Sequence, residues 1–275
     1  MALSGIPVLN YHAIDNNNLT TASRNVSVSL SSFRQQMGWL ASEGYKTIGP
    51  GELKQIVLNK KRVSGKFVLI TFDDGYHSLF EHALGILSEH GYTAMLFLST
   101  AYMGGPYDQH DFYFVKHDRQ LTWGEVKALS ASGWSIQSHG NTHVKMTSID
   151  HNALLDEVTK SKNLIEQNLG IQVDSFAFPY GIYNNAVIKQ LKATGYQFAY
   201  SVHSGKLSSS SNRFHLPRIE INNMDTMESF ITKVRTGHTS PSEAFRAKIR
   251  DVAFANTAVK DLIEKWTHKM GYGNR

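Results

Sequence analysis

The chain of 275 residues contains no cysteine. This absence excludes a disulfide-stapled fold and any thiolate that could act as a metal ligand or nucleophile. No apolar run approaches the ~18 residues that a membrane-spanning helix needs. The first residues, MALSGIPVLNYH, have neither a basic segment nor an apolar core, so they predict no signal peptide. The chain is therefore expected to be either cytoplasmic or a mature form whose signal has been removed.

A concentrated basic surface is also missing. Lys and Arg number 28 against 23 Asp and Glu, giving a net charge of +5, and the densest basic cluster is only Lys60, Lys61 and Arg62. We therefore expect no nucleic-acid partner, whereas attraction to an anionic cell surface fits the same charge. With 41% hydrophobic and 19% charged residues, the composition also excludes a disordered or collagen-like chain.

Strand-like and helix-like segments alternate along most of the chain. Helical patterns include residues 32–43, 77–90, 150–169 and 184–194, several of them closed by glycine. Seven apolar, β-branched or aromatic segments predict strands, and they are residues 8–11, 67–72, 93–99, 134–137, 173–178, 197–202 and 216–221.

Near-continuous apolar strands separated by helices are typical of a parallel sheet covered by helices. We expect an α/β fold, a distorted (β/α) barrel of about seven parallel strands, with an open doubly wound sheet as the alternative. The absence of an internal repeat or linker predicts one domain over residues 1–275. Residues 242–270 are expected to form a helical segment that packs on the barrel wall.

Chemically reactive residues follow four of the predicted strands. His12 follows the first, Asp73-Asp74-Gly75 the second, SHGNTH at 138–143 the fourth, and Pro179-Tyr180-Gly181 the fifth. The carboxyl ends of parallel strands meet at one edge, which is where α/β proteins place their functional groups. These groups are therefore expected to share a site.

Adjacent Asp73 and Asp74 would repel each other after a buried strand unless a cation compensates them, although an Asp-Asp-Gly turn can also simply cap a helix. His139 and His143, four residues apart, would supply two imidazole ligands beside one carboxylate, and the alternative is two surface histidines. His12 could act in catalysis or have a structural role.

The segment FAFPYG at 176–181 is open to two interpretations. Proline fixes the turn, and the backbone N–H that follows could stabilise an oxyanion, or the turn could be an ordinary one. Aromatic residues between 101 and 120, Tyr113 among them, could contact sugar rings or a membrane, or could pack as the core of a loop.

The motifs TFDDG at 71–75, SHGNTH at 138–143 and FAFPYG at 176–181 resemble those of the NodB-homology polysaccharide deacetylases, carbohydrate esterase family 4. PVLNYHAI near the start and HLPRIEI at 215–221 most resemble the branch that acts on poly-β-1,6-N-acetyl-D-glucosamine of bacterial biofilms. The common third motif has an arginine where this chain has Ala177, and Arg218 is a candidate replacement or, alternatively, a surface residue. The usual fourth motif, DxxDW, has no match.

The resemblance implies a metal-dependent hydrolase of carbon–nitrogen bonds that removes acetyl groups from an N-acetylated polysaccharide. It implies a divalent metal on Asp74, His139 and His143, zinc first, with nickel, cobalt or iron as alternatives. It assigns the general base to Asp73 and the general acid to His12. The backbone N–H of Tyr180 is the expected donor to the oxyanion. Candidate substrate contacts are Pro179, Arg218 and Tyr113.

The same resemblance implies action outside the cytoplasm, at the cell surface or on a membrane, and we expect a monomer. Chitin oligomers, peptidoglycan and acetylated xylan are alternative substrates. A catalytically silent carbohydrate-binding protein on the same fold is the alternative of a different class, and failure to bind metal would favour it.

Overall fold

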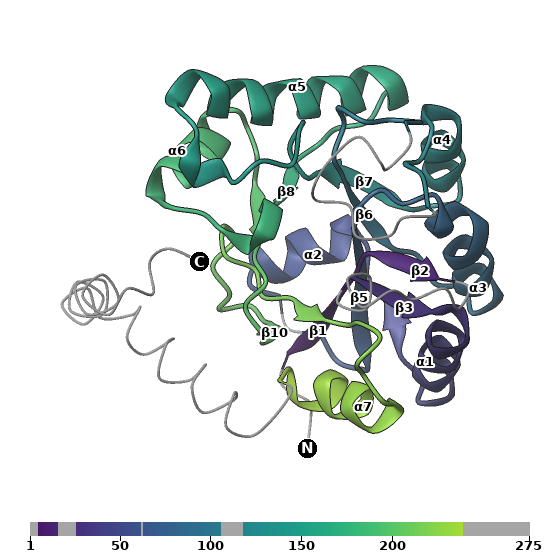
Figure 1. Cartoon of the computed structure of the whole chain (residues 1–275). Helices are drawn as coiled ribbons and strands as arrows, with labels where there is room; N and C mark the ends of the chain where they lie inside the picture. Colours follow the sequence, from purple (N-terminus) through teal and green to yellow (C-terminus); the bar gives the residue numbers. More distant parts are fainter. Residues whose placement is uncertain (1–4, 16–25, 62, 106–117, 239–275) are drawn as a thin grey trace.

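The computed structural model describes residues 5–15, 26–61, 63–105 and 118–238 (Figure 1). Tyr113 and the predicted helical segment 242–270 lie outside these residues. A strand is present at each of the seven positions that the sequence predicts. These strands are β1 (Ile6–Tyr11), β5 (Phe67–Asp74), β6 (Met95–Leu98), β7 (Ser135–Ser138), β8 (Ser175–Ala177), β9 (Phe198–Tyr200) and β11 (Ile219–Glu220).

The strands form a nearly closed barrel. The main path of the sheet is β10-β1-β5-β6-β7-β8-β9, and the pairs from β1 to β9 are parallel. Beyond β9, Leu216 bridges Tyr200, and β11 then pairs with β1 in parallel. Residues 216–221 therefore lie between the two ends of the sheet, and the predicted barrel is confirmed.

Short strands complete the architecture. β4 (Lys46–Thr47) pairs with β5, while β2 (Ala13–Asp15) and β3 (Ser27–Ser29) form a separate parallel pair. β10 (Lys206–Leu207) runs antiparallel to β1, which makes the sheet mixed. β9 runs in the same direction as β1, so a β10 parallel to β1 would also have to run in the direction of β9. Two consecutive strands in the same direction need a crossover of a dozen or more residues, and residues 201–205 between β9 and β10 are too few to provide it.

All the labelled helices except α2 lie around the outside of the sheet (Figure 1). The predicted helix at 77–90 begins as a π-helical turn over Leu79–Ala83 and continues as α3 (Leu84–Glu89). No helix in the described ranges is both long and apolar enough to span a bilayer. The remaining α-helices are α1 (Leu30–Ser42), α2 (Pro50–Val57), α4 (Trp123–Ala131), α5 (His151–Leu169), α6 (Asn185–Ala193) and α7 (Met227–Thr236).

Alternation along β5 places the chemistry inside the barrel. Ile70 and Phe72 pack in the apolar cluster between sheet and helices, whereas Leu69 belongs to the cluster inside the barrel. Because successive side chains of a strand point to opposite faces, Thr71 and Asp73 share the inner face with Leu69. The strand thus delivers a buried carboxylate to the C-terminal end of the barrel interior.

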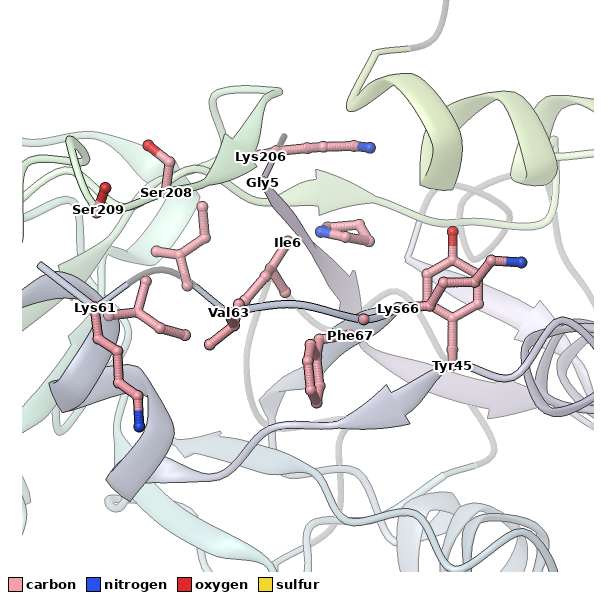
Figure 2. A pocket seen from close by; sticks show the side chains of 14 residues that line it. Gly5, Ile6, Tyr45, Lys61, Val63, Lys66, Phe67, Lys206, Ser208 and Ser209 are labelled. Atoms are coloured by element: carbon pink, nitrogen blue, oxygen red, sulfur yellow. The ribbon is translucent and has the colours of Figure 1, made fainter. Parts of the chain in front are cut away.

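The opposite end of the barrel is filled by α2. Its residues Leu53, Ile56 and Val57 join the same inner cluster as Leu69. Beside it, at the starts of β1 and β5, lies a cavity of about 430 Å³ whose lining includes Val63 and three lysines (Figure 2).

Candidate functional site

The predicted functional side chains meet in one small pocket at the C-terminal ends of the strands. Its volume is about 100 Å³. β1, β5 and the segments that follow β7 and β8 all contribute to it, as expected from the chain order of the motifs. The lining residues are His12, Val26, Asp73, Asp74, His139, His143, Phe178, Tyr180, Gly181 and Val202.

Asp74, His139 and His143 form a buried cluster that could hold a metal ion, with one ligand atom from each within 4.8 Å of the others. Oδ1 of Asp74 lies 3.5 Å from Nε2 of His139 and 3.3 Å from Nε2 of His143. Ligand atoms about 2.1 Å from a tetrahedral zinc ion stand roughly 3.4 Å apart. These two spacings therefore suit a divalent ion.

The polar atoms of this cluster also fit a cation. Oδ1 of Asp74 is buried and accepts no hydrogen bond from the described residues. Nδ1 of His139 lies 2.8 Å from the carbonyl of Ala177, an acceptor, so this nitrogen carries the proton and Nε2 presents its lone pair. Burial, reinforced by the nearby His139, holds the pKa of His143 well below 6.5 and keeps its imidazole neutral, as metal ligation requires.

The main cationic partner of Asp73 is Arg218. Two nitrogens of the guanidinium lie 2.6 and 2.8 Å from the two oxygens of the carboxylate, and Arg218 is 0% exposed. Burial alone would raise the pKa of Asp73, but the charge of Arg218, aided by His139, lowers it well below 3.8. Asp73 is therefore an ionised carboxylate in a buried place.

Asp74 has the opposite electrostatic environment. Burial raises its pKa, the attraction of His12 and His139 opposes this, and the neighbouring charge of Asp73 adds to it. Its backbone carbonyl accepts a hydrogen bond from Nε2 of Gln120. The two adjacent carboxylates thus differ in their partners. Asp73 is paired with Arg218, whereas Asp74 lies beside His139 and His143 in the cluster that could hold a metal ion.

His12 faces Asp73 across the pocket. Its Nε2 lies 4.0 Å from Oδ2 of Asp73, and its side chain is 17% exposed. The described residues offer no hydrogen-bond partner to its Nδ1. A titratable imidazole and an ionised carboxylate therefore border the same space from two neighbouring strands.

Backbone strain gathers around the pocket. The non-glycine residues with positive φ in the described ranges are Lys60 and three residues of the pocket, Asp74 (φ 72°), His143 (φ 57°) and Tyr180 (φ 58°). The left-handed conformation costs an L-residue roughly 1–2 kcal/mol. Such strain persists where surrounding contacts over-determine the backbone, and it often accompanies function.

Two of the three candidate substrate contacts, Pro179 and Arg218, are buried. Pro179 is buried in the short helix Pro179–Gly181, and Arg218 is buried with its guanidinium on Asp73, so neither side chain is open to a polymer. Tyr180 is 43% exposed, and its ring centroid lies 4.7 Å from that of His143.

Two polar residues near the site were not predicted from the sequence. Oδ1 of Asn10, on the inner face of β1, accepts a hydrogen bond from Arg218. Glu157, on α5, accepts hydrogen bonds from the loop that carries His139 and His143. A polar residue within an apolar strand, or on the apolar face of a helix, was the available signal in both cases.

Comparison with known proteins supports the same family. The polysaccharide deacetylase family model matches residues 60–199, just over half of the chain. YxkH of Bacillus subtilis, which carries a polysaccharide-deacetylase name, is 29% identical over 216 residues, covering 78% of this chain and 71% of that protein. The poly-β-1,6-N-acetyl-D-glucosamine N-deacetylase of Staphylococcus aureus is 26% identical over 248 residues, covering 82% and 81%.

The fold has close structural neighbours. The structure of the Streptococcus pyogenes deacetylase PplD in complex with acetate superposes with a TM-score of 0.72, at 24% identity, over 84% of this chain and 98% of that one. Together with the family match and the motifs that line the pocket, this shows that the chain belongs to the polysaccharide deacetylases of carbohydrate esterase family 4, hydrolases that act on carbon–nitrogen bonds.

Proposed function

We propose that this protein removes N-acetyl groups from a GlcNAc-containing polysaccharide, poly-β-1,6-N-acetyl-D-glucosamine, in a metal-dependent reaction. The observation that carries the proposal is the shared pocket of Asp73, Asp74, His139, His143 and His12. A divalent ion on Asp74, His139 and His143 would activate water and polarise the acetyl carbonyl.

Asp73 is the general base of this proposal. It lies beside the ligand cluster, with Oδ2 3.9 Å from Nε2 of His139, and the Arg218 guanidinium keeps it ionised. An ionised carboxylate in a poorly solvated pocket can accept a proton from the attacking water. Arg218 acts by orienting Asp73 and supplies the cation that Ala177 cannot provide in the third motif.

His12 and Tyr180 complete the assignment. The imidazole of His12 is on the accessible side of Asp73, from which it can donate a proton to the leaving amine. The backbone N–H of Tyr180, in its left-handed turn, is the proposed donor to the oxyanion. The products are acetate and a glucosamine unit whose free amine makes the polymer cationic.

The choice of substrate rests on the S. aureus relative, whose alignment extends over most of both chains. The opening motif PVLNYHAI, which places His12 at the end of β1, supports the same branch. Because this substrate is a polymer of the cell exterior, we place the activity at the cell surface, with a monomeric protein acting there.

The test is acetate release from β-1,6-linked GlcNAc oligomers with zinc, with other divalent ions and with a chelator. Asp73→Asn is the matched control because it removes the base while leaving the three ligands. Metal-dependent release by the natural chain and not by the variant is the expected result.

Chitin oligomers, peptidoglycan and acetylated xylan are run in parallel. Preferential release from any of them would overturn the proposed substrate and keep the reaction class. A metal-loaded protein that is silent on all substrates would contradict the proposed function, and a protein that binds no metal would favour a carbohydrate-binding role.

A further inference from the structure

The loop that follows β7 carries two of the three proposed metal ligands, yet contacts with other elements hold its backbone. The carbonyls of Gly140 and Asn141 accept hydrogen bonds from the backbone N–H groups of Thr100 and Ala101, and Tyr102 Oη donates to the carbonyl of Thr142. The segment after β6 therefore satisfies one side of the loop.

Glu157 satisfies the other side. Its Oε2 accepts the backbone N–H groups of Asn141 and Thr142, each at 2.9 Å, and Oε1 accepts the hydroxyl of Thr142. Glu157 is 7% exposed on the inner face of α5. Hydrogen bonds to an ionised carboxylate are stronger than those between neutral groups. A buried carboxylate that accepts several of them therefore holds the donating backbone firmly.

The packing around Gly140 shows how closely this anchor fits. Gly140 has φ 81°, and a Cβ there would lie 2.9 Å from Cε of Met146 and 3.2 Å from Oε2 of Glu157. The same helix makes a second tie, since the hydroxyls of Ser138 and Ser161 lie 2.7 Å apart. Two successive turns of α5 thus hold the end of β7 and the loop that follows it.

We propose that Glu157 is a positioning residue that sets the metal affinity of the protein. Its carboxylate fixes the backbone between His139 and His143, including the strained turn at His143, so that both Nε2 atoms face Asp74 before an ion binds. Partners outside the ligand set typically contribute 10–100-fold to metal affinity. This inference rests on the metal role that the proposed function gives to the cluster.

A structural anchor alone would affect folding and leave the affinity of the folded protein unchanged, so the test measures zinc binding directly. Metal-free full-length protein is titrated with zinc against a chromophoric chelator, and thermal unfolding of each metal-free variant is recorded in parallel. The variants are Glu157→Ala and Glu157→Gln, together with Glu166→Ala.

Glu166 provides the matched control. It lies on the same helix, and its Oε1 accepts the backbone N–H of Val173, far from the ligand loop in the chain. Both alanine variants therefore lose a carboxylate that anchors a loop to α5. We expect Glu157→Ala to weaken zinc binding 10–100-fold, and Glu166→Ala to keep the natural affinity.

Glu157→Gln should lie between these values because its amide oxygen can still accept the backbone N–H groups. If Glu157→Ala does not fold, Glu157→Gln and Thr142→Val, which removes only the hydroxyl donor, are each expected to weaken binding several-fold. Natural zinc affinity in the folded Glu157 variants, or an equal loss in Glu166→Ala, would overturn the inference.

Two further outcomes separate this inference from the proposed function. A natural chain that does not bind zinc would overturn both. A natural chain that binds zinc through Glu157-dependent affinity but deacetylates no substrate would overturn the proposed function and support the positioning role.

Discussion

The two ends of the barrel differ in what their pockets contain. The cavity at the N-terminal ends of the strands is the larger, at about 430 Å³ against about 100 Å³. Two of its three lysines already have partners: Lys66 lies 2.8 Å from Glu43, and Lys206 donates to the carbonyl of Arg235. The small pocket instead borders two buried carboxylates in different electrostatic environments.

Backbone strain also differs between the two ends of the barrel. Asp74, His143 and Tyr180 are left-handed around the small pocket, while at the other end Lys60 is left-handed in the exposed segment after α2. The larger of these two cavities is therefore not the site to which the proposed function assigns the chemistry. Buried charge and a backbone held away from its preferred conformation are the better guides.

The largest expected difference between the ends is catalytic. Asp73→Asn should lower kcat by about 10²–10⁴-fold because the proposed proton acceptor is lost. Its zinc content should stay close to that of the natural protein. Lys61→Ala, in the lining of the larger cavity, should leave kcat unchanged. Initial rates of acetate release and metal analysis decide this, and normal turnover by Asp73→Asn would remove the role assigned to Asp73.

The second difference concerns stability. Arg218→Met leaves Asp73 buried without a cation, and removal of one partner from a buried pair costs about 3–5 kcal/mol. Lys66→Met, at the other end, removes an ion pair between exposed side chains and should change the free energy of unfolding little. Urea unfolding of both variants measures the contrast, and equal stabilities would show that the buried pair is not held as described.

Two glycines with the same backbone conformation sharpen the comparison further. Gly170 at the end of α5 has φ 65° and no atom within 4 Å of an added Cβ, so Gly170→Ala should cost about 1–2 kcal/mol. Gly181 has φ 68°, but its Cβ would overlap Cγ2 of Val202.

Gly181→Ala should therefore be less stable than Gly170→Ala by roughly 1–3 kcal/mol from overpacking. It should also reduce kcat/KM because Gly181 and Val202 line the pocket. Thermal unfolding together with steady-state kinetics tests both parts. A loss of activity in Gly170→Ala alone would reverse the expected order.

The smallest effect tests an ion pair outside the lining of the small pocket. The hydrogen bonds from Arg119 lower the pKa of Glu125 from 4.5 to about 2. Burial acts in the opposite direction, and the hydrogen bonds from Thr122 add to the lowering. A depressed carboxyl pKa stabilises the fold above the unfolded pKa, and this contribution is lost as the pH falls through the folded pKa.

Glu125→Gln should therefore cost about 1 kcal/mol at pH 7, and its deficit should shrink between pH 4.5 and pH 2. Turnover should be unaffected. Urea unfolding at several pH values measures the deficit, and a deficit that grows in acid would contradict the assigned pKa direction.

The sequence predicted the strands and the shared site because both depend on local pattern. Apolar strands ending in His12, Asp73 and His139 indicate one sheet edge without further information. The predicted helical segments did not include α4, although the sequence contains a signal for it. Thr122 and Glu125 form a capping box at the start of this helix.

Long-range partners were harder to predict. The resemblance to the family indicates that Ala177 stands where an arginine is usual, but only barrel closure brings Arg218 to Asp73. Glu157 shares a helix face with apolar Leu154 and Val158, and only the tertiary structure places the ligand loop against it. Such pairings depend on how elements pack, which local propensity does not encode.

The segment that closes the barrel also constrains the order of folding. Arg218 is 145 residues from Asp73 and 208 from Asn10 along the chain, and it contacts both. A nascent chain that ends before residue 218 has β5 but no cation for its buried carboxylate. Contacts of such sequence separation slow folding. The interior of this barrel should therefore exclude water only after β11 has been synthesised, so the ion pair of the proposed base and the closure of the barrel arrive together.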